Sequence, residues 1–181
     1  VNSSQVSDKH IYFGGEFGRA FSQLRSFLAS FNRLKGTLTN WTPSISGSSM
    51  LTKVTSISLS DSILYVGGYF TKADTLSRNF LAAFDTSWSY PLPWNPNPTG
   101  QIYELEAGDS VLYAVGAFLY INGVYDLTRG CIAAIDKKIG IPHNWIVNAN
   151  STTESVDVYS NCEGETVFAG GVFSTINGHP R

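Results

Sequence analysis

The sequence contains the hexapeptide Tyr65-Val66-Gly67-Gly68-Tyr69-Phe70, and three related hexapeptides occur elsewhere in the chain. Each begins with an aromatic residue, has glycine at its fourth position and ends with Phe. The three are Tyr12-Phe13-Gly14-Gly15-Glu16-Phe17, Tyr113-Ala114-Val115-Gly116-Ala117-Phe118 and Phe168-Ala169-Gly170-Gly171-Val172-Phe173. Self-similarity of this kind is the sequence signature of a repeat architecture.

Two further blocks recur in the same order and at near-constant spacing. An apolar block occupies residues 27–32, 80–85 and 131–136, and a tryptophan follows it at Trp41, Trp94 and Trp145. Together the blocks define a repeat of about 50 residues in about three and a half copies. We place the repeats at 1–53, 54–101, 102–155 and 156–181.

The pattern inside one repeat is that of β-structure. Residues 54–59 alternate in character and predict a first strand, Asp61-Ser62 predicts a turn, and the aromatic and β-branched run 63–70 predicts a second strand. A polar loop at 71–79 precedes a third, apolar strand at 80–85, and a short fourth strand leads into Trp94. In other copies the loop contains the turn dipeptides Asn122-Gly123 and Asn177-Gly178. Four short antiparallel strands per repeat are typical of a β-propeller blade, so the expected fold is an all-β propeller segment of about 3.5 blades.

Face-to-face packing of such blades explains the repeated residues. Because the middle strands have no solvent-exposed face, they must be apolar throughout. The glycine pair of the second strand is expected where a neighbouring sheet or the axis approaches closely, and its second member is Gly15, Gly68, Gly116 or Gly171. The tryptophans Trp41, Trp94 and Trp145 are expected to fill the space between blades. Arg25, Arg78 and Arg129 each precede a third strand, with Arg181 in the same phase, and are expected to bond loop carbonyls or a carboxylate such as Asp85 or Asp136.

Three segments of the second copy carry a family resemblance. They are residues 64–70, residues 78–85, and Pro93-Trp94-Asn95-Pro96-Asn97-Pro98. This string resembles the delta-60-type repeat and, more distantly, the kelch-like repeats of fungal cell-surface cortical markers. The resemblance covers nearly the whole chain and weakens in the third copy, where Val115 replaces a glycine. It implies a β-propeller in a secreted or surface protein, with no catalytic residues to carry over.

The chain starts and stops in different phases of the repeat. Closed propellers need about four to eight blades, so a half-blade at 156–181 leaves an unpaired strand edge. Three explanations stay open: the chain is a fragment of a longer propeller, another chain supplies the missing strands in an oligomer or filament, or the blades stack as an open array.

The composition of the chain limits its possible cellular location and the classes of partner that it could bind. The chain is 43% hydrophobic and 14% charged with a net charge of −2, which gives no basic surface for nucleic acid. No apolar run approaches the ~20 residues that cross a bilayer. The chain opens at Val1 without a leader pattern, so we expect any secretion signal to have been removed or to lie outside this segment. Asn2, Asn40 and Asn150 begin N-glycosylation acceptor triplets, which together with the low charge suggests an extracellular or cell-surface glycoprotein.

Candidate chemical sites are few. Cys131 and Cys162 fall at opposite ends of a blade, so we expect no disulfide between them and a core position for Cys131. His10, His143 and His179 have no partner at metal-ligand spacing, and no Asp-x-Asp-x-Asp series supports a calcium site. We therefore expect no metal, no cofactor and no catalytic site.

Two features of the sequence point to other functions. Ala134, Asp136, Gly140 and Trp145 are similar to the docking motif of quinone-dependent dehydrogenase propellers, but the Gly-to-Trp spacing is one residue longer and no catalytic Asp is found. A lectin-like or adhesive role would use exposed loop aromatics, for which Trp88, Tyr90, Tyr120 and Tyr125 are the candidates. The sequence therefore favours a structural or adhesive module that is not an enzyme.

Overall fold

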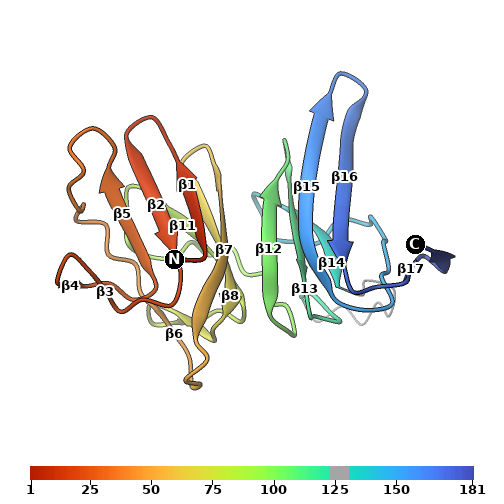
Figure 1. Ribbon diagram of the computed structural model, residues 1–181, viewed down its shortest axis with the longest axis horizontal. Coiled ribbons are helices and arrows are strands. Elements are labelled where there is room, and N and C mark those ends of the chain that lie inside the picture. The colour runs from red at the N-terminus through yellow and green to blue at the C-terminus, as the bar shows by residue number, and fades with distance from the viewer. Residues whose placement is uncertain (123–130) are drawn as a thin grey trace.

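The computed structural model describes residues 1–122 and 131–181, and the regular elements in these ranges are all β-strands (Figure 1). The all-β class predicted from the sequence is confirmed. Gly123, Tyr125 and Arg129, which the sequence singled out, lie outside the described residues.

Four main antiparallel sheets follow one another along the chain, and the third strand of a repeat always pairs with the second. Sheet 1 contains β1 (Ser3–Val6), β2 (His10–Gly14) and β5 (Leu28–Asn32). Sheet 2 contains β7 (Lys53–Ser60), β8 (Ile63–Tyr69) and β11 (Leu81–Asp85). Sheet 3 contains β12 (Ile102–Ala107), β13 (Val111–Gly116) and β14 (Ile132–Asp136). Sheet 4 contains β15 (Thr153–Asn161) and β16 (Gly164–Gly171). The strands predicted at 54–59, 63–70 and 80–85 are each confirmed to within one residue.

The prediction of a fourth strand is wrong, because the segment after each third strand forms only an isolated β-bridge. Each third strand pairs with the segment after it at one position, and the pairs are Phe31 with Leu38, Phe84 with Pro91, and Ile135 with Pro142. One further main-chain hydrogen bond follows each bridge, for example from Leu92 N to Ala83 O at 2.8 Å. In two repeats the bridging residue is proline, which has no N–H to extend a ladder.

The last repeat begins earlier than the sequence indicated. β15 starts at Thr153 and therefore crosses the boundary that we placed between residues 155 and 156. A register shift between Thr153 and Ser155 matches the shift between Val54 and Ser56 in β7, so Thr153 is the counterpart of Val54. Its polar character concealed the start of the strand.

The loops between second and third strands carry short hairpins. These are β3 (Arg19–Ala20) with β4 (Gln23–Leu24), β9 (Lys72–Ala73) with β10 (Leu76–Ser77), and β17 (Thr175–Ile176) with β18 (His179–Pro180). Another strand, β6 (Ile45–Ser46), follows Trp41 and pairs with β9, so it ties the end of one repeat to the loop of the next. The predicted turn at Asn177-Gly178 is confirmed by φ angles of 50° and 77°.

The sheets stand side by side with their faces toward one another, from sheet 1 on the left of Figure 1 to sheet 4 on the right. Accordingly, the apolar core is divided into three clusters, each lying between two consecutive sheets. The clusters join Tyr12 to Phe84, Tyr65 to Ile135, and Tyr113 to Val156. The third strand of sheet 2 is fully buried from Leu81 to Phe84, as predicted for a strand with no solvent-exposed face.

The two glycines of the hexapeptide are required for two different steric reasons. A Cβ on Gly67 would lie 2.6 Å from Ile102 Cγ2 in sheet 3, so this glycine admits the neighbouring sheet, as expected. A Cβ on Gly68 would instead press on Lys53 O in the first strand of the same sheet, beside the register shift. Gly116 and Gly171 meet the backbone in the same way, at Gln101 O and Thr152 O. The expected neighbouring-sheet role of the second glycine is therefore corrected to an intra-sheet one.

We expect Gly68→Ala to cost more stability than Gly67→Ala. The Gly68 methyl meets fixed backbone, whereas the Gly67 methyl meets side-chain atoms of Ile102 that can shift, and overpacking typically costs about 1–3 kcal/mol. Urea unfolding should place Gly67→Ala within this range and Gly68→Ala above it. Equal losses, or a reversed order, would contradict the assignment of the two glycines.

Candidate functional site

The contacts between sheets repeat, and their centre is the tryptophan at the end of each repeat. Trp41 packs edge-to-face on Tyr12 of its own sheet and on Phe84 of the next, with ring centroids 5.5 and 6.3 Å apart. Its Nε1 donates to the main-chain oxygens of Asp85 at 3.3 Å and Trp88 at 2.9 Å. The predicted filling of the space between repeats is confirmed for this residue, which is 7% exposed.

Trp94 makes the same contacts one repeat later. It packs on Tyr65 at 5.1 Å, and its Nε1 donates to Asp136 O at 3.0 Å in sheet 3. The acceptors Asp85 and Asp136 both end third strands, so each indole closes on the last residue of the next sheet's third strand. This polar contact fixes the register of one sheet on the next, which apolar packing alone would leave free to slide.

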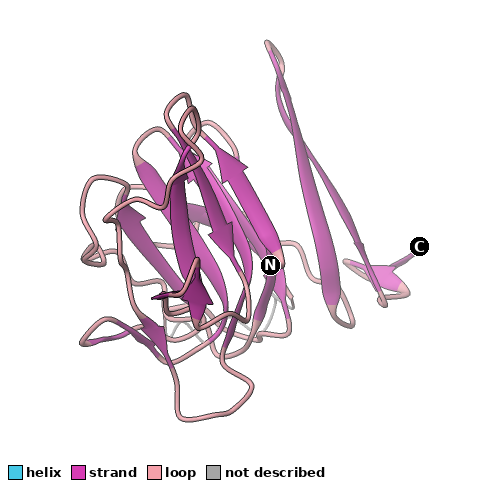
Figure 2. Cartoon of the chain, turned by 60° about the vertical axis from the view of Figure 1, so that its left-hand side comes forward, coloured by secondary structure: helices cyan, strands magenta, loops and turns pink. Residues whose placement is uncertain are grey.

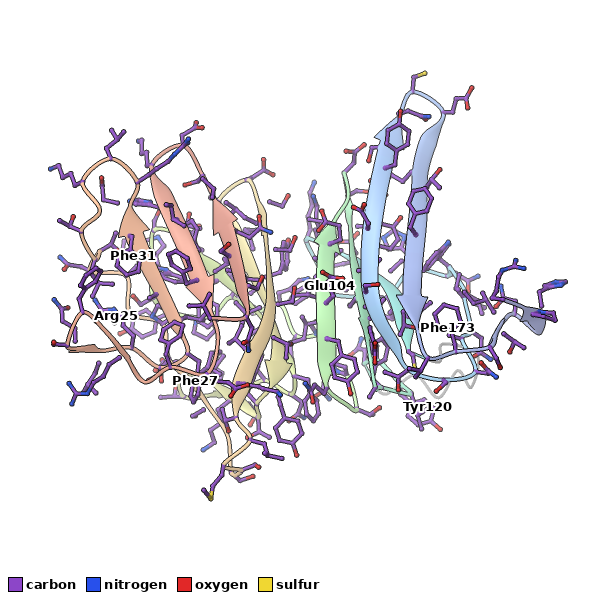
Figure 3. The ribbon with its side chains drawn as sticks, viewed as in Figure 1. Arg25, Phe27, Phe31, Glu104, Tyr120 and Phe173 are labelled. Atoms are coloured by element: carbon purple, nitrogen blue, oxygen red, sulfur yellow. The ribbon has the colours of Figure 1, made fainter. Side chains whose placement is uncertain are left out.

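The first strands are joined by a second repeated hydrogen bond, in which a side chain accepts from the main chain of the following sheet. Ser3 Oγ accepts from Ile57 N at 3.1 Å, and Ser56 Oγ accepts from Leu105 N at 3.1 Å. Glu104 Oε2 accepts from Val156 N at 2.8 Å, and Figure 3 labels Glu104 between sheets 3 and 4. Serine and glutamate share little except an acceptor oxygen, so sequence comparison of the copies did not find this position.

The arginines hold the segment that leads to each tryptophan. Arg25, labelled in Figure 3, donates to Leu24 O at 2.7 Å and Thr39 O at 2.9 Å. Arg78 donates to Ser77 O and Leu92 O, both at 2.9 Å. The expected bonds to carbonyls are present in these two copies, and burial lowers the pKa of Arg78.

In each of the three repeats with a third strand, the residue directly before that strand has a positive φ angle, which the sequence analysis did not predict. Phe27, Phe80 and Cys131 have φ angles of 68°, 61° and 67°, a region that bulky residues rarely enter. Each is held on both sides: Phe80 N donates to Phe70 O, and Phe80 O accepts from Gly68 N, both at 3.0 Å. The tight connection between second and third strands therefore uses an ordinary side chain where glycine would be expected.

Sheet 4 exposes one face and the outer edge of its second strand. β16 pairs with β15 alone among the described residues, and the hairpin lies at one end of the row of sheets in Figure 2. Phe168 is 57% exposed, although its counterparts Tyr12 and Tyr65 are 2% and 1% exposed. The open surface is therefore built from residues of a kind that the preceding sheets bury.

In the described part of the chain, Trp145 and Arg181 lack hydrogen bonds that the corresponding residues of the earlier repeats make. Trp145 packs on Tyr113 at 5.5 Å, but its Nε1 donates no hydrogen bond within the described residues, unlike Trp41 and Trp94. Arg181 donates to Pro180 O at 3.0 Å, as Arg78 does to Ser77 O, and makes no counterpart of the bond from Arg78 to Leu92 O. Both missing acceptors belong, in the complete repeats, to the third strand or the segment after it.

The two cysteines lie in different surroundings. Cys131 and Cys162 are free cysteines, the first buried in the core and the second exposed at the tip of the β15–β16 hairpin. Burial raises the pKa of the Cys131 thiol. His143 is 3.7 Å from an Asp136 carboxylate oxygen, and among residues 1–122 and 131–181 no three His, Cys, Asp or Glu side chains gather as metal ligands.

The loop aromatics differ in exposure. Trp88 and Tyr90 are 69% and 71% exposed, whereas Tyr120 is half-buried. Trp88 and Tyr90 lie in the turn between β11 and Trp94. Trp88 is held through its main chain, since its N–H donates to Asp85 O at 3.2 Å and its carbonyl accepts from Trp41 Nε1 at 2.9 Å. The rings of these two residues are therefore exposed to solvent, as a ligand-binding role would require.

The three acceptor asparagines have different surroundings. The Nδ2 atom of Asn2 donates to Val54 O at 2.8 Å, and that of Asn150 donates to Ser174 Oγ at 3.1 Å. Asn40 is exposed, and its side chain donates no hydrogen bond within the described part of the chain. All three asparagines are exposed, and they differ in that the side-chain amides of Asn2 and Asn150 donate hydrogen bonds.

No protein-family model and no curated protein matches the chain. The resemblance to the delta-60-type repeat therefore stays a prediction. Among the described residues, no helix has the length and apolar character required to cross a bilayer.

Titration of Tyr65 gives a test of the junction between sheets 2 and 3. Its hydroxyl donates to Lys137 O at 2.9 Å, and burial, with smaller effects of Asp136 and Asp61, raises the pKa of Tyr65 from 10.0 to about 12. The folded state then holds this proton more tightly than the unfolded state does, so the stabilisation is complete below pH 10 and is lost as pH rises toward 12.

We expect the urea midpoint of the wild-type chain to fall between pH 10 and about 12, and Tyr65→Phe to remove part of that fall. Tyr90→Phe is the matched control, because Tyr90 is 71% exposed. Identical pH profiles for wild type and Tyr65→Phe would show that the phenol is not protected from ionisation by the fold.

Proposed function

We propose that the chain is a non-catalytic β-propeller segment of an extracellular or cell-surface repeat protein, with a structural or adhesive role. The observation that carries the proposal is the pair Trp41 and Trp94, whose indole N–H groups each donate to a main-chain oxygen of the following repeat. A contact of this kind builds an extended stack of sheets and requires no reactive group.

We propose that the open edge of sheet 4 is a surface that pairs with a further strand. Trp145 and Arg181 are placed as Trp94 and Arg78 are, and Phe168 presents an aromatic ring where Tyr65 packs on Trp94. We propose that a strand with the sequence character of β11 pairs with β16, and that its return segment accepts from Arg181. The same repeat in a longer chain, or another chain in an oligomer or filament, would supply such a strand.

The register of this strand follows from the complete sheets. In sheet 2, Leu81 pairs with Gly67, Ala83 with Tyr65 and Asp85 with Ile63. Because Gly170 and Phe168 correspond to Gly67 and Tyr65, the added strand would place its first apolar residue opposite Gly170 and its second alanine opposite Phe168. The Asp that ends the strand would then offer its carbonyl to Trp145, as Asp136 does to Trp94.

A synthetic peptide of residues 79–96 tests this proposal on the intact chain. We expect the peptide to bind and to slow hydrogen exchange at the main-chain amides of β16, while amides of β8, which are already paired, do not change. A peptide with Ala82→Asp and Ala83→Asp is the matched control, because a carboxylate on either face cannot enter the core. Unchanged exchange in β16, or equal protection by the control peptide, would count against the proposed edge.

A carbohydrate-binding or protein-binding propeller is the second candidate, and the exposure of Trp88 and Tyr90 favours it. Exposed aromatic rings offer the apolar faces of sugars a flat surface, with serine hydroxyls close by at Ser87 and Ser89. On a glycan array we expect binding that is lost in Trp88→Ala and kept in Phe21→Ala, since Phe21 is equally exposed at 73% but lies in another loop. An array without signal, or a signal that survives Trp88→Ala, would leave the structural role alone.

A further inference from the structure

One position after the third strand differs in chemistry among the three repeats that have this strand. Arg33, Thr86 and Lys137 are equivalent, because each backbone N–H donates to the hairpin of its own sheet. The acceptors are Lys9 O at 2.8 Å, Ser62 O at 2.8 Å and Ser110 O at 3.2 Å. Two of the three side chains are cations and the middle one is a short hydroxyl.

Lys137 shows what a cation does at this position. Its Nζ donates to Ser60 Oγ at 2.8 Å in sheet 2 and to Gly108 O at 2.7 Å in sheet 3. The ammonium group therefore bridges the two sheets near the hydroxyl of Tyr65, which donates to Lys137 O. Charge-assisted bonds of this length are among the stronger polar contacts in proteins.

Corresponding acceptors exist one junction earlier, between sheets 1 and 2, without the lysine. Of these, Ser7 Oγ already accepts from His10 N at 3.0 Å and donates to His10 O at 3.2 Å, so it has one lone pair left to accept from an ammonium group. By strand register Ser7 corresponds to Ser60, and Ser60 corresponds to Gly108. Thr86 stands where Lys137 stands, and its side chain is three atoms shorter. A cleft of about 690 Å³ lies at this junction, lined by Ser7, Asp8, Trp41, Asp61 and Thr86 among others.

The chemistry of this cleft suits a cation on an aliphatic stem. Asp8 and Asp61 lie in the turns of the two hairpins and supply negative charge, while Trp41 supplies an aromatic wall that favours cations. Lys9 and His10 also line the cleft. The ammonium of Lys9 donates no hydrogen bond among the described residues, so it is the internal competitor that the test must separate.

We propose that the cleft between sheets 1 and 2 binds a primary ammonium group on a short aliphatic chain, such as a lysine side chain of a bound protein. The ammonium takes the place that Lys137 Nζ holds at the next junction and donates to Ser7 Oγ and Ser60 O. The site depends only on the packing of sheets 1 and 2, so it stands whether or not a strand completes sheet 4.

The first test is an NMR titration of the full chain with Nα-acetyl-lysine methylamide. We expect saturable shifts at the amides of Ser7 and Thr86 and at the Trp41 indole. The Nε-acetylated form of the same ligand, which has no charge, should bind at least about tenfold more weakly. Shifts that do not saturate, or equal binding of both forms, would overturn the proposal.

The second test fills the site from within. Thr86→Lys should reproduce the bridge made by Lys137, raise the unfolding midpoint and abolish binding of the ligand. Thr86→Met, which is of similar length and uncharged, should not raise the midpoint in a salt-dependent way. If Thr86→Lys binds the ligand as wild type does, the ligand occupies another place and the assignment is wrong.

Two further variants identify the occupant. Lys137→Ala should open a second site at the next junction, so that n-propylamine restores part of the lost stability and n-propanol does not. Lys9→Met should tighten ligand binding by removing the competitor. If Lys9→Met instead lowers stability and leaves the ligand without effect, Lys9 itself fills the cleft and the site is not one for an external ligand.

Discussion

The indole N–H of Trp41 and that of Trp94, each donated to a carbonyl at the end of the next sheet's third strand, are the interactions on which this stack depends. Apolar sheet faces attract one another without fixing their relative position, because burial is not directional. A buried donor whose acceptors lie only on the neighbouring repeat makes a slipped arrangement unfavourable, since an unpaired indole N–H in the core costs roughly 1–3 kcal/mol. Trp41 and Trp94 satisfy this condition at two junctions.

The other repeated contacts build on that register. The side-chain acceptors Ser3, Ser56 and Glu104 tie the first strands together, and Arg25 and Arg78 hold the segments that carry the tryptophans. Each contact joins neighbours in the stack, so stability is spread over junctions and is not concentrated in one centre. Because sheet 4 has two strands among the described residues, Phe168 is exposed there, and Trp145 and Arg181 lack the second contacts that Trp94 and Arg78 make.

Much of this arrangement was predictable because the repeat makes one physical requirement visible several times. The strands of sheet 2, the burial of residues 81–84 and the contact role of Trp41 follow from apolar and aromatic residues in a constant phase. Other features escaped prediction because their requirement is on the backbone or on a single oxygen atom. Phe80 at positive φ looks like an ordinary strand residue, and Ser56 and Glu104 share only their acceptors. The prediction of a fourth strand was wrong because the pairing of that segment ends after one bridge.

Exchange of the four tryptophan indole protons with solvent, measured by NMR, tests the central claim most directly. The account predicts slow exchange for Trp41 and Trp94, which donate across a junction, and fast exchange for Trp145 and Trp88. Trp88 is the internal reference for an open indole, since it is 69% exposed. Exchange of Trp41 and Trp94 as fast as that of Trp88 would mean that the indoles do not lock one sheet to the next, and the stacking account would be contradicted.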